Sequence, residues 1–310
     1  MSLDAETRTF LDRVAASNTK PRHLMTPEEA RAAFSGLRSI VALGPYVRTV
    51  RDLKIPVEGA ALPCRLFVPS ATPRALLVYF HGGGWVVGSV EEFDALCREI
   101  AVGADVAVAL VEYRKAPEHR FPGPVNDACT AVAWLHASRA TLLGSELTLV
   151  VGGDSAGANL AIAVTLQTRR LGGPALAGQL LIYPVTDCRF DRPSYVDRDN
   201  QLLTNRDTMQ WYWSHYLPDP SERLSSLASP CREADLSGLP EAIVLTAEHD
   251  VLRDEGEEYA QRLKAAGVVV HHWRAPQQMH GFLMMLGLLP GSRDGLQFVC
   301  GQLRQLTAAA

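Results

Sequence analysis

The sequence has few of the features that mark several protein classes. Its six cysteines lie at least 32 positions apart and form no CxxC pair, which argues against the spacing of zinc and dithiol redox sites. No apolar run approaches the roughly 18 residues that a membrane-spanning helix needs. The first ten residues include Asp4 and Glu6 and no continuous apolar stretch, so we expect no signal or transit peptide there. We therefore expect reduced thiols, a cytoplasmic location and no membrane association.

An excess of charge of one sign is also missing. Thirty lysines and arginines nearly balance 34 aspartates and glutamates, and the formal net charge is −4. This balance gives no electrostatic reason to expect a nucleic-acid partner. The 310 residues are 47% hydrophobic and 21% charged, which is the composition of a globular protein large enough to bury an extensive core.

After residue 73 the chain alternates short apolar runs with amphipathic segments. Apolar runs without polar alternation are typical of parallel strands that are covered on both faces. Such runs occur at 75–80, 106–111, 147–151, 179–183, 242–247 and 268–273, and helices are predicted at 91–103, 124–138, 156–171, 253–266 and 293–306. Two earlier β-rich stretches, 47–55 and 61–68, suit an antiparallel pair. The pattern predicts a doubly wound α/β fold whose central sheet is mostly parallel and flanked by helices.

Two parts of the chain fall outside this alternation. Residues 1–45 contain two predicted helices, the second of which runs from a capping box at Thr26 to Gly44. Residues 187–239 contain no apolar strand but include one amphipathic helical segment. Insertions of this length between strands are seldom structureless. We expect the two parts to form a helical cap on a catalytic domain that spans 46–310.

The strongest motif is Gly153-Asp154-Ser155-Ala156-Gly157, which follows one predicted strand and opens the next predicted helix. A GxSxG pattern often occurs by chance, and its strand–turn–helix context is what points to a nucleophile. The turn has to be so tight that only small residues fit on either side of the serine. The hydroxyl would lie at a helix N-terminus, whose partial positive charge favours an oxyanion. The alternative is a glycine-rich turn without a catalytic role.

A second glycine-rich segment favours the catalytic interpretation. His81-Gly82-Gly83-Gly84-Trp85 follows directly on the strand predicted at 75–80. Three consecutive glycines lose much backbone entropy on folding, so a merely flexible connector is a poor explanation for them here. Because glycines have no Cβ, their N–H groups can closely approach a substrate oxygen and stabilise an oxyanion. The two motifs together are typical of lipases and esterases.

A serine nucleophile needs an orienting carboxylate, which in this fold follows the serine and precedes the histidine in the chain. Glu248, Asp250 and Asp254 all follow the strand predicted at 242–247. Asp250 is favoured because it falls in the loop, whereas Asp254 suits the first turn of the following helix, where it would interact with the helix dipole.

The general base should follow the last strand in a loop. His271 and His272 lie inside the strand predicted at 268–273, where we expect them to be packed or solvated. His280 lies in a predicted loop seven residues beyond that strand. It is therefore the predicted base.

These motifs resemble those of the bacterial hormone-sensitive-lipase family of α/β-hydrolases. The resemblance covers essentially the whole chain and rests on HGGGW (81–85), YRKAPEHRFPGPVND (113–127), GDSAG (153–157), EHDVLRDEG (248–256) and HGF (280–282). It implies an α/β-hydrolase fold in which Ser155 is the nucleophile, Asp250 the acid and His280 the base. These roles agree with the interpretation of the residues themselves.

The resemblance also concerns the glycine-rich loop. It implies that the backbones of Gly83, Gly84 and Ala156 supply the oxyanion donors. It also implies that His81, which precedes Gly82 in the loop motif, has a mainly structural role. The sequence departs from the family where Lys115 replaces the usual leucine and Arg120 the usual proline. These departures affect a loop beside the site and put only its local packing in question.

We therefore predict a serine carboxylesterase that hydrolyses short- to medium-chain esters through an acyl-enzyme intermediate, without a metal or other cofactor. Its partner is a small-molecule ester, and a homodimer is common in the family. The apolar pocket is expected to include Phe34, Trp85, Trp211 and Trp213.

Three alternatives to this prediction stay open. The same triad could hydrolyse amides or arylformamides, or the enzyme could be a lipase that acts on aggregated lipid. A non-catalytic small-molecule receptor is the third, because the plant gibberellin receptors of this family are of that kind. Those receptors lack the triad histidine, which is present here as His280.

Overall fold

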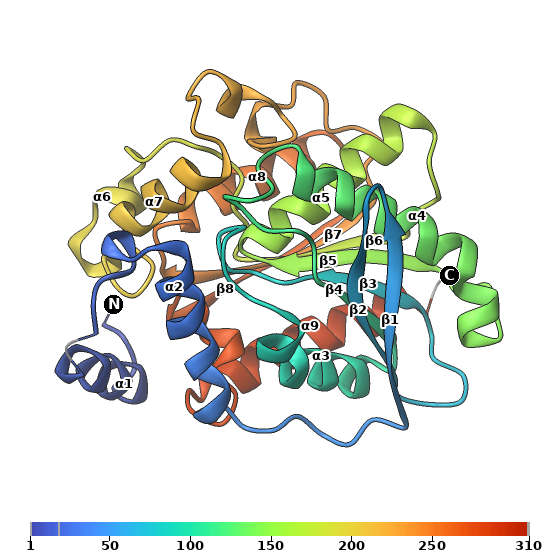
Figure 1. Ribbon diagram of the computed structural model, residues 1–310, viewed down its shortest axis with the longest axis horizontal. Helices are drawn as coiled ribbons and strands as arrows, with labels where there is room; N and C mark the ends of the chain where they lie inside the picture. The colour runs from blue at the N-terminus through green and yellow to red at the C-terminus, as the bar shows by residue number, and fades with distance from the viewer. Residues whose placement is uncertain (1, 18, 309–310) are drawn as a thin grey trace.

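A computed structural model describes residues 2–17 and 19–308 of the chain (Figure 1). Eight strands form one sheet in the order β1-β2-β4-β3-β5-β6-β7-β8. β2 is antiparallel to both β1 and β4, and all the other neighbouring strands are parallel, as predicted. The strands are β1 (Thr49–Val57), β2 (Ala60–Val68), β3 (Leu76–Phe80), β4 (Ala107–Val111), β5 (Leu149–Asp154), β6 (Gly178–Ile182), β7 (Glu241–His249) and β8 (Val270–Met279).

Helices cover both faces of this sheet. Figure 1 shows α3 and α9 on one side of the sheet and α4, α5 and α8 on the other, and each side has its own cluster of buried apolar side chains. All five helices predicted after residue 90 are present. The helices are α1 (Ala5–Ala16), α2 (Pro27–Ser35), α3 (Val90–Ala104), α4 (Gly123–Leu143), α5 (Ala156–Leu171), α6 (Pro193–Val196), α7 (Arg206–Tyr216), α8 (Arg253–Ala265) and α9 (Gly291–Leu306).

The second N-terminal helix is shorter than predicted. Its capping box is present, since the Thr26 hydroxyl accepts the Glu29 N–H at 3.2 Å and the Glu29 carboxylate accepts the Thr26 N–H at 2.9 Å. The α-helix nevertheless ends at Ser35, and a 3₁₀ helix (Gly36–Ser39) replaces the predicted continuation to Gly44. Glycine is less favourable than alanine in a helix by about 1 kcal/mol, so Gly36 is where the regular helix gives way.

The N-terminal segment and the 187–239 insertion lie side by side in Figure 1. The 3₁₀ helix η1 (Arg22–Leu24) packs against α7, whose start is capped by the Asn205 side chain accepting the Thr208 N–H at 2.9 Å. Both segments line the same cavity as Ser155. Within the described ranges, no helix combines the length and apolar character needed to cross a membrane.

Candidate active site

Ser155 lies in a very tight turn between β5 and α5. Its backbone has φ 53° and ψ −118°, a strained conformation for a residue with a side chain. A Cβ on Gly157 would lie 1.9 Å from the Phe80 carbonyl oxygen, and one on Gly153 would lie 2.4 Å from the same atom. The prediction that only small residues fit around the serine is confirmed.

Ser155, His280 and Asp250 form one hydrogen-bonded chain. The Ser155 Oγ lies 3.1 Å from His280 Nε2, and His280 Nδ1 lies 2.7 Å from Asp250 Oδ2. Asp250 is fully buried, and its other carboxylate oxygen accepts the Leu252 N–H at 2.9 Å. The arrangement suits proton transfer from the serine to an imidazole whose tautomer is held by a carboxylate.

Asp250 and His280 meet because they follow adjacent strands. Asp250 comes directly after β7. The prediction that His280 lies in a loop seven residues past the last strand is wrong. β8 continues to Met279, so His280 follows the strand directly. Pro276 interrupts the apolar pattern without ending the strand, since β8 is at the edge of the sheet, where a missing N–H is tolerated.

The other candidate acids and bases have different neighbours. Asp254 lies in the first turn of α8, where it accepts the Ser194 N–H at 2.7 Å. His271 Nε2 lies 3.0 Å from the Glu241 carboxylate, and His272 Nε2 lies 3.0 Å from the Thr246 hydroxyl. None of these contacts involves the serine.

Tyr183 is a neighbour of the triad that the sequence did not reveal. It follows β6, and its ring packs at an angle on the His280 imidazole, with the ring centroids 4.6 Å apart. Its position at the carboxyl end of a parallel strand, the edge that also holds Ser155, Asp250 and His280, is the signal that could have identified it.

The glycine-rich loop reaches the cavity that contains Ser155. Gly83 (φ 108°) and Gly84 (φ 57°) adopt conformations that favour glycine, and both line the cavity that contains Ser155. A Cβ on Gly84 would lie 2.2 Å from the Tyr212 ring. Ala156 begins α5, so its N–H lacks an intrahelical acceptor.

His81 belongs to this loop but is not among the residues that line the cavity. Its ring stacks on Tyr113 with the centroids 4.5 Å apart, and the Tyr113 hydroxyl donates to the His81 carbonyl at 2.9 Å. Its Nδ1 lies 2.7 Å from the Gly82 carbonyl oxygen and therefore carries the proton of that hydrogen bond. Burial, together with the nearby Lys115 charge, lowers the pKa of His81 to about 4. The imidazole is thus neutral near pH 7.

Asp154 links the serine turn to the glycine-rich loop. One carboxylate oxygen accepts the Tyr79 hydroxyl at 3.0 Å and the Gly82 N–H at 2.9 Å. Burial raises the pKa of Asp154 to about 7, although the hydrogen bonds from Tyr79 and Gly82 oppose the shift. The residue was visible in the GDSAG motif, but no sequence pattern indicated that it would be buried under the other loop.

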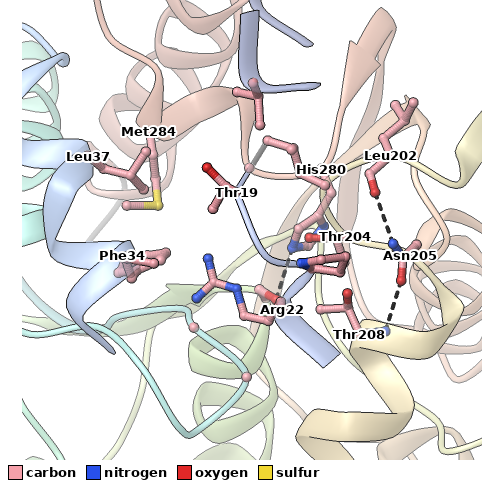
Figure 2. Close-up of a pocket in the computed structure, with 18 of the residues that line it drawn as sticks. Thr19, Arg22, Phe34, Leu37, Leu202, Thr204, Asn205, Thr208, His280 and Met284 are labelled. Atoms are coloured by element: carbon pink, nitrogen blue, oxygen red, sulfur yellow. Dashed lines mark hydrogen bonds between the residues drawn. The ribbon is translucent and has the colours of Figure 1, made fainter. Parts of the chain in front are cut away.

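A cavity of about 540 Å³ opens onto Ser155 and His280 (Figure 2). Phe34, which the sequence placed in the pocket, lines it together with residues from the N-terminal segment, the insertion and the 280–285 segment. Its apolar lining includes Phe10, Val14, Met25, Phe34, Leu37, Ile40, Leu202, Leu203, Met209, Met284 and Met285.

The three tryptophans predicted for the pocket lie elsewhere. Trp85 is fully buried between Tyr216, on which it stacks at 4.1 Å, and Trp213, whose ring centroid is 5.0 Å away. Trp211 lies on another face of α7, against His215. Tyr212, one residue from two of these tryptophans, is the aromatic residue of α7 that reaches the cavity. Sequence alone could not assign the faces of a helix with aromatic residues on several sides.

Residues 2–17 and 19–308 contain no group of three or more His, Cys, Asp or Glu side chains arranged to hold a metal ion.

Comparison with known proteins gives a consistent result. The profile of a family with the alpha/beta hydrolase fold matches residues 77–284. The carboxylesterase NlhH of Mycobacterium tuberculosis is 36% identical over 274 residues, which cover 86% of this chain and 85% of the relative. The ethyl acetate hydrolase of Pseudomonas putida is 35% identical over 319 residues, covering 98% of this chain and 99% of the relative.

Solved esterase structures are similar along nearly the whole chain. A thermostable esterase from Pseudomonas putida superposes with a TM-score of 0.92 and 32% identity, covering 99% of this chain and 98% of its own. A hyperthermophilic esterase from Pyrobaculum calidifontis has a TM-score of 0.90 and 34% identity, with complete coverage of both chains.

The raised pKa of Asp154 predicts a pH dependence of stability. The folded protein holds this proton up to about pH 7, whereas the unfolded chain releases it near the ordinary value of 3.8. Stability contributed by the neutral carboxyl is therefore lost as the pH rises from about 4 to 7. Asp154→Asn keeps an acceptor oxygen but does not titrate, so its unfolding free energy should rise relative to the parent across this range. Denaturant unfolding of both proteins at several pH values measures this difference, and parallel curves would contradict it.

Proposed function

Because this chain belongs to the α/β-hydrolase fold family and is a carboxylic-ester hydrolase, we propose that Ser155 is its nucleophile, His280 its general base and Asp250 the orienting acid. The observation that carries the proposal is the pair of hydrogen bonds, 3.1 Å and 2.7 Å long, that joins the three side chains, two of which, Ser155 and His280, line the cavity.

In the first half of the reaction, the Ser155 Oγ attacks the ester carbonyl carbon while His280 Nε2 takes the hydroxyl proton. Asp250 holds the other imidazole nitrogen in its protonated form and stabilises the imidazolium that results. The N–H groups of Gly83, Gly84 and Ala156 donate to the oxyanion, with the N-terminus of α5 adding its partial positive charge.

In the second half, His280 first gives its proton to the departing alcohol, which leaves Ser155 acylated. The imidazole then takes a proton from a water molecule that attacks the acyl carbon. The bond between the Ser155 Oγ and the acyl carbon breaks, His280 returns the proton to the Oγ, and the acid is released. Each proton transfer passes through His280 Nε2, which faces both the serine and the cavity.

The substrate class follows from the cavity. We propose that residues 2–45 and the 187–239 insertion act as a cap that encloses the acyl or alcohol part of a short- to medium-chain ester. The volume of about 540 Å³ and the apolar lining support this size class, since small-molecule sites of about 300–1,000 Å³ are typical.

A cytoplasmic location and a homodimer complete the proposal. The six cysteines are all unpaired, which suits a reducing compartment. The dimer rests on the family resemblance, and light scattering coupled to size-exclusion chromatography measures it directly.

Replacement of the nucleophile should abolish turnover without unfolding the protein. Ser155→Ala is expected to lower kcat by at least about 10⁴-fold, because the three triad groups act as a unit. A fluorophosphonate should label the parent enzyme stoichiometrically, and peptide mass spectrometry should locate the adduct at Ser155. An adduct on a different serine would show that the nucleophile is wrongly assigned.

Two nearby aspartates should respond differently to the same substitution. Asp250→Asn should lower kcat by several orders of magnitude, since the imidazole loses the group that holds its tautomer. Asp254→Asn should mainly lower the unfolding free energy, by at most about 1 kcal/mol, because it removes a negative charge from the first turn of α8. Steady-state kinetics and denaturant unfolding of both variants separate the two effects, and the opposite ranking would overturn the choice of acid.

Activity should depend on acyl-chain length with a maximum. Each buried methylene contributes about 0.8 kcal/mol while the cavity has room, and overfilling a packed site costs about 1–3 kcal/mol. We expect kcat/KM on p-nitrophenyl esters to peak at about four to eight acyl carbons, without a jump above the substrate's solubility limit. Removal of residues 1–44 should flatten this profile, because it takes away one wall of the cavity. A preference for acyl chains of about sixteen carbons would contradict the enclosed pocket.

A further inference from the structure

Arg22 is a charged side chain of the cavity that the mechanism does not use. Apart from the triad histidine, the charged residues that line the cavity are Lys20, Arg22 and Asp154. Lys20 is paired with the Glu29 carboxylate at 2.7 Å. Asp154 is held by its hydrogen bonds under the serine turn. Among residues 2–17 and 19–308, no carboxylate forms an ion pair with Arg22.

Arg22 is held in place by neutral groups. Its Nη1 donates to the Ala30 carbonyl at 3.1 Å, and its guanidinium carbon lies 5.7 Å from the centroid of the Phe34 ring. Burial raises the pKa of the Tyr212 hydroxyl, and the nearby Arg22 charge and a hydrogen bond from Arg22 oppose this shift. The side chain is half-buried. In Figure 2 the guanidinium points into the cavity between Phe34 and the side that carries Thr204 and His280.

The positive charge of Arg22 is not balanced by a carboxylate of the described residues. An arginine guanidinium carries a positive charge and presents five N–H donors, and here the Ala30 carbonyl and the Tyr212 hydroxyl, both neutral, accept from it. The surrounding wall is mostly apolar, so water screens the charge less than on an open surface. Such a fork can bind a planar carboxylate through two parallel hydrogen bonds.

We propose that Arg22 is a specificity-determining residue that binds a free carboxylate on the substrate, so that the enzyme favours esters with a carboxylate remote from the scissile bond. The half-ester of a dicarboxylic acid is the simplest example. Its hydrolysis would consume one water and release the dicarboxylate, the alcohol and one proton. This inference rests on the proposed function, because the ester group has to reach Ser155 while the carboxylate reaches Arg22.

The test compares two substrates that differ in charge and little in shape. One is monoethyl adipate, and the other is the ethyl ester in which an isopropyl group replaces its free carboxylate. The parent enzyme should hydrolyse the half-ester with a kcat/KM at least about equal to that of the neutral ester, although an apolar pocket alone would strongly reject an anion. A half-ester value about a hundredfold lower would overturn the proposal.

Substitution of the arginine should change the ratio of the two kcat/KM values. Arg22→Met is expected to lower the half-ester to neutral-ester ratio by at least about tenfold, mainly through KM, and Arg22→Lys should restore part of it. Arg38→Met is the matched control, because Arg38 is an exposed cation of the same N-terminal segment, paired with Glu91 outside this cavity. Its ratio should equal that of the parent.

The outcomes separate the two hypotheses. If Arg22 only stabilises the cap, Arg22→Met will lower both kcat/KM values equally and leave their ratio unchanged, which overturns the inference but not the esterase mechanism. If the triad is wrongly assigned, Ser155→Ala will still hydrolyse the neutral ester. Should Arg22→Met fail to fold, the ratio measured with the parent enzyme and with Arg22→Lys still decides the question.

Discussion

The contact that the rest of the site depends on is the one between the serine turn and the end of β3. Gly153 and Gly157 both place their Cα atoms where a side chain would overlap the Phe80 carbonyl oxygen. This contact allows the turn to hold Ser155 in its strained conformation at the start of α5. The glycine-rich loop begins at the next residue after β3, so the same contact brings Gly83 and Gly84 to the cavity that contains Ser155. One steric constraint therefore positions both segments.

Three buried carboxyl groups hold other parts of the site in position. Asp154 ties the serine turn to the Gly82 N–H, while Asp250 orients the imidazole. Glu255, which is fully buried near the start of α8, accepts the Thr186 N–H at 2.7 Å and the Asp187 N–H at 3.2 Å. Burial raises the pKa of Glu255 well above its usual range. Through it, the beginning of the insertion is anchored to the helix that follows the catalytic acid.

Residues from distant parts of the chain meet at the cavity. The glycine-rich loop, Ser155, Asp250 and His280 follow β3, β5, β7 and β8, whereas most of the cavity lining comes from the N-terminal segment and the insertion. The hydrogen bonds among Ser155, His280 and Asp250 involve no residue of these two segments. Arg22, which forms no ion pair with a described carboxylate, lines the same cavity and takes no part in those hydrogen bonds.

The sequence by itself determined the order of the strands and helices, the tight turn at Ser155 and the identity of the three residues that meet in the triad. These depend on local patterns: apolar runs, glycine spacing and the position of Asp250 and His280 after their strands. Only the tertiary structure decided which side chains line the cavity. Trp85 and Trp213 pack into the core while Tyr212 and Arg22 reach the cavity, because these orientations depend on how distant segments pack together. The continuation of β8 through Pro276 likewise depends on its place at the sheet edge, which no local pattern reveals.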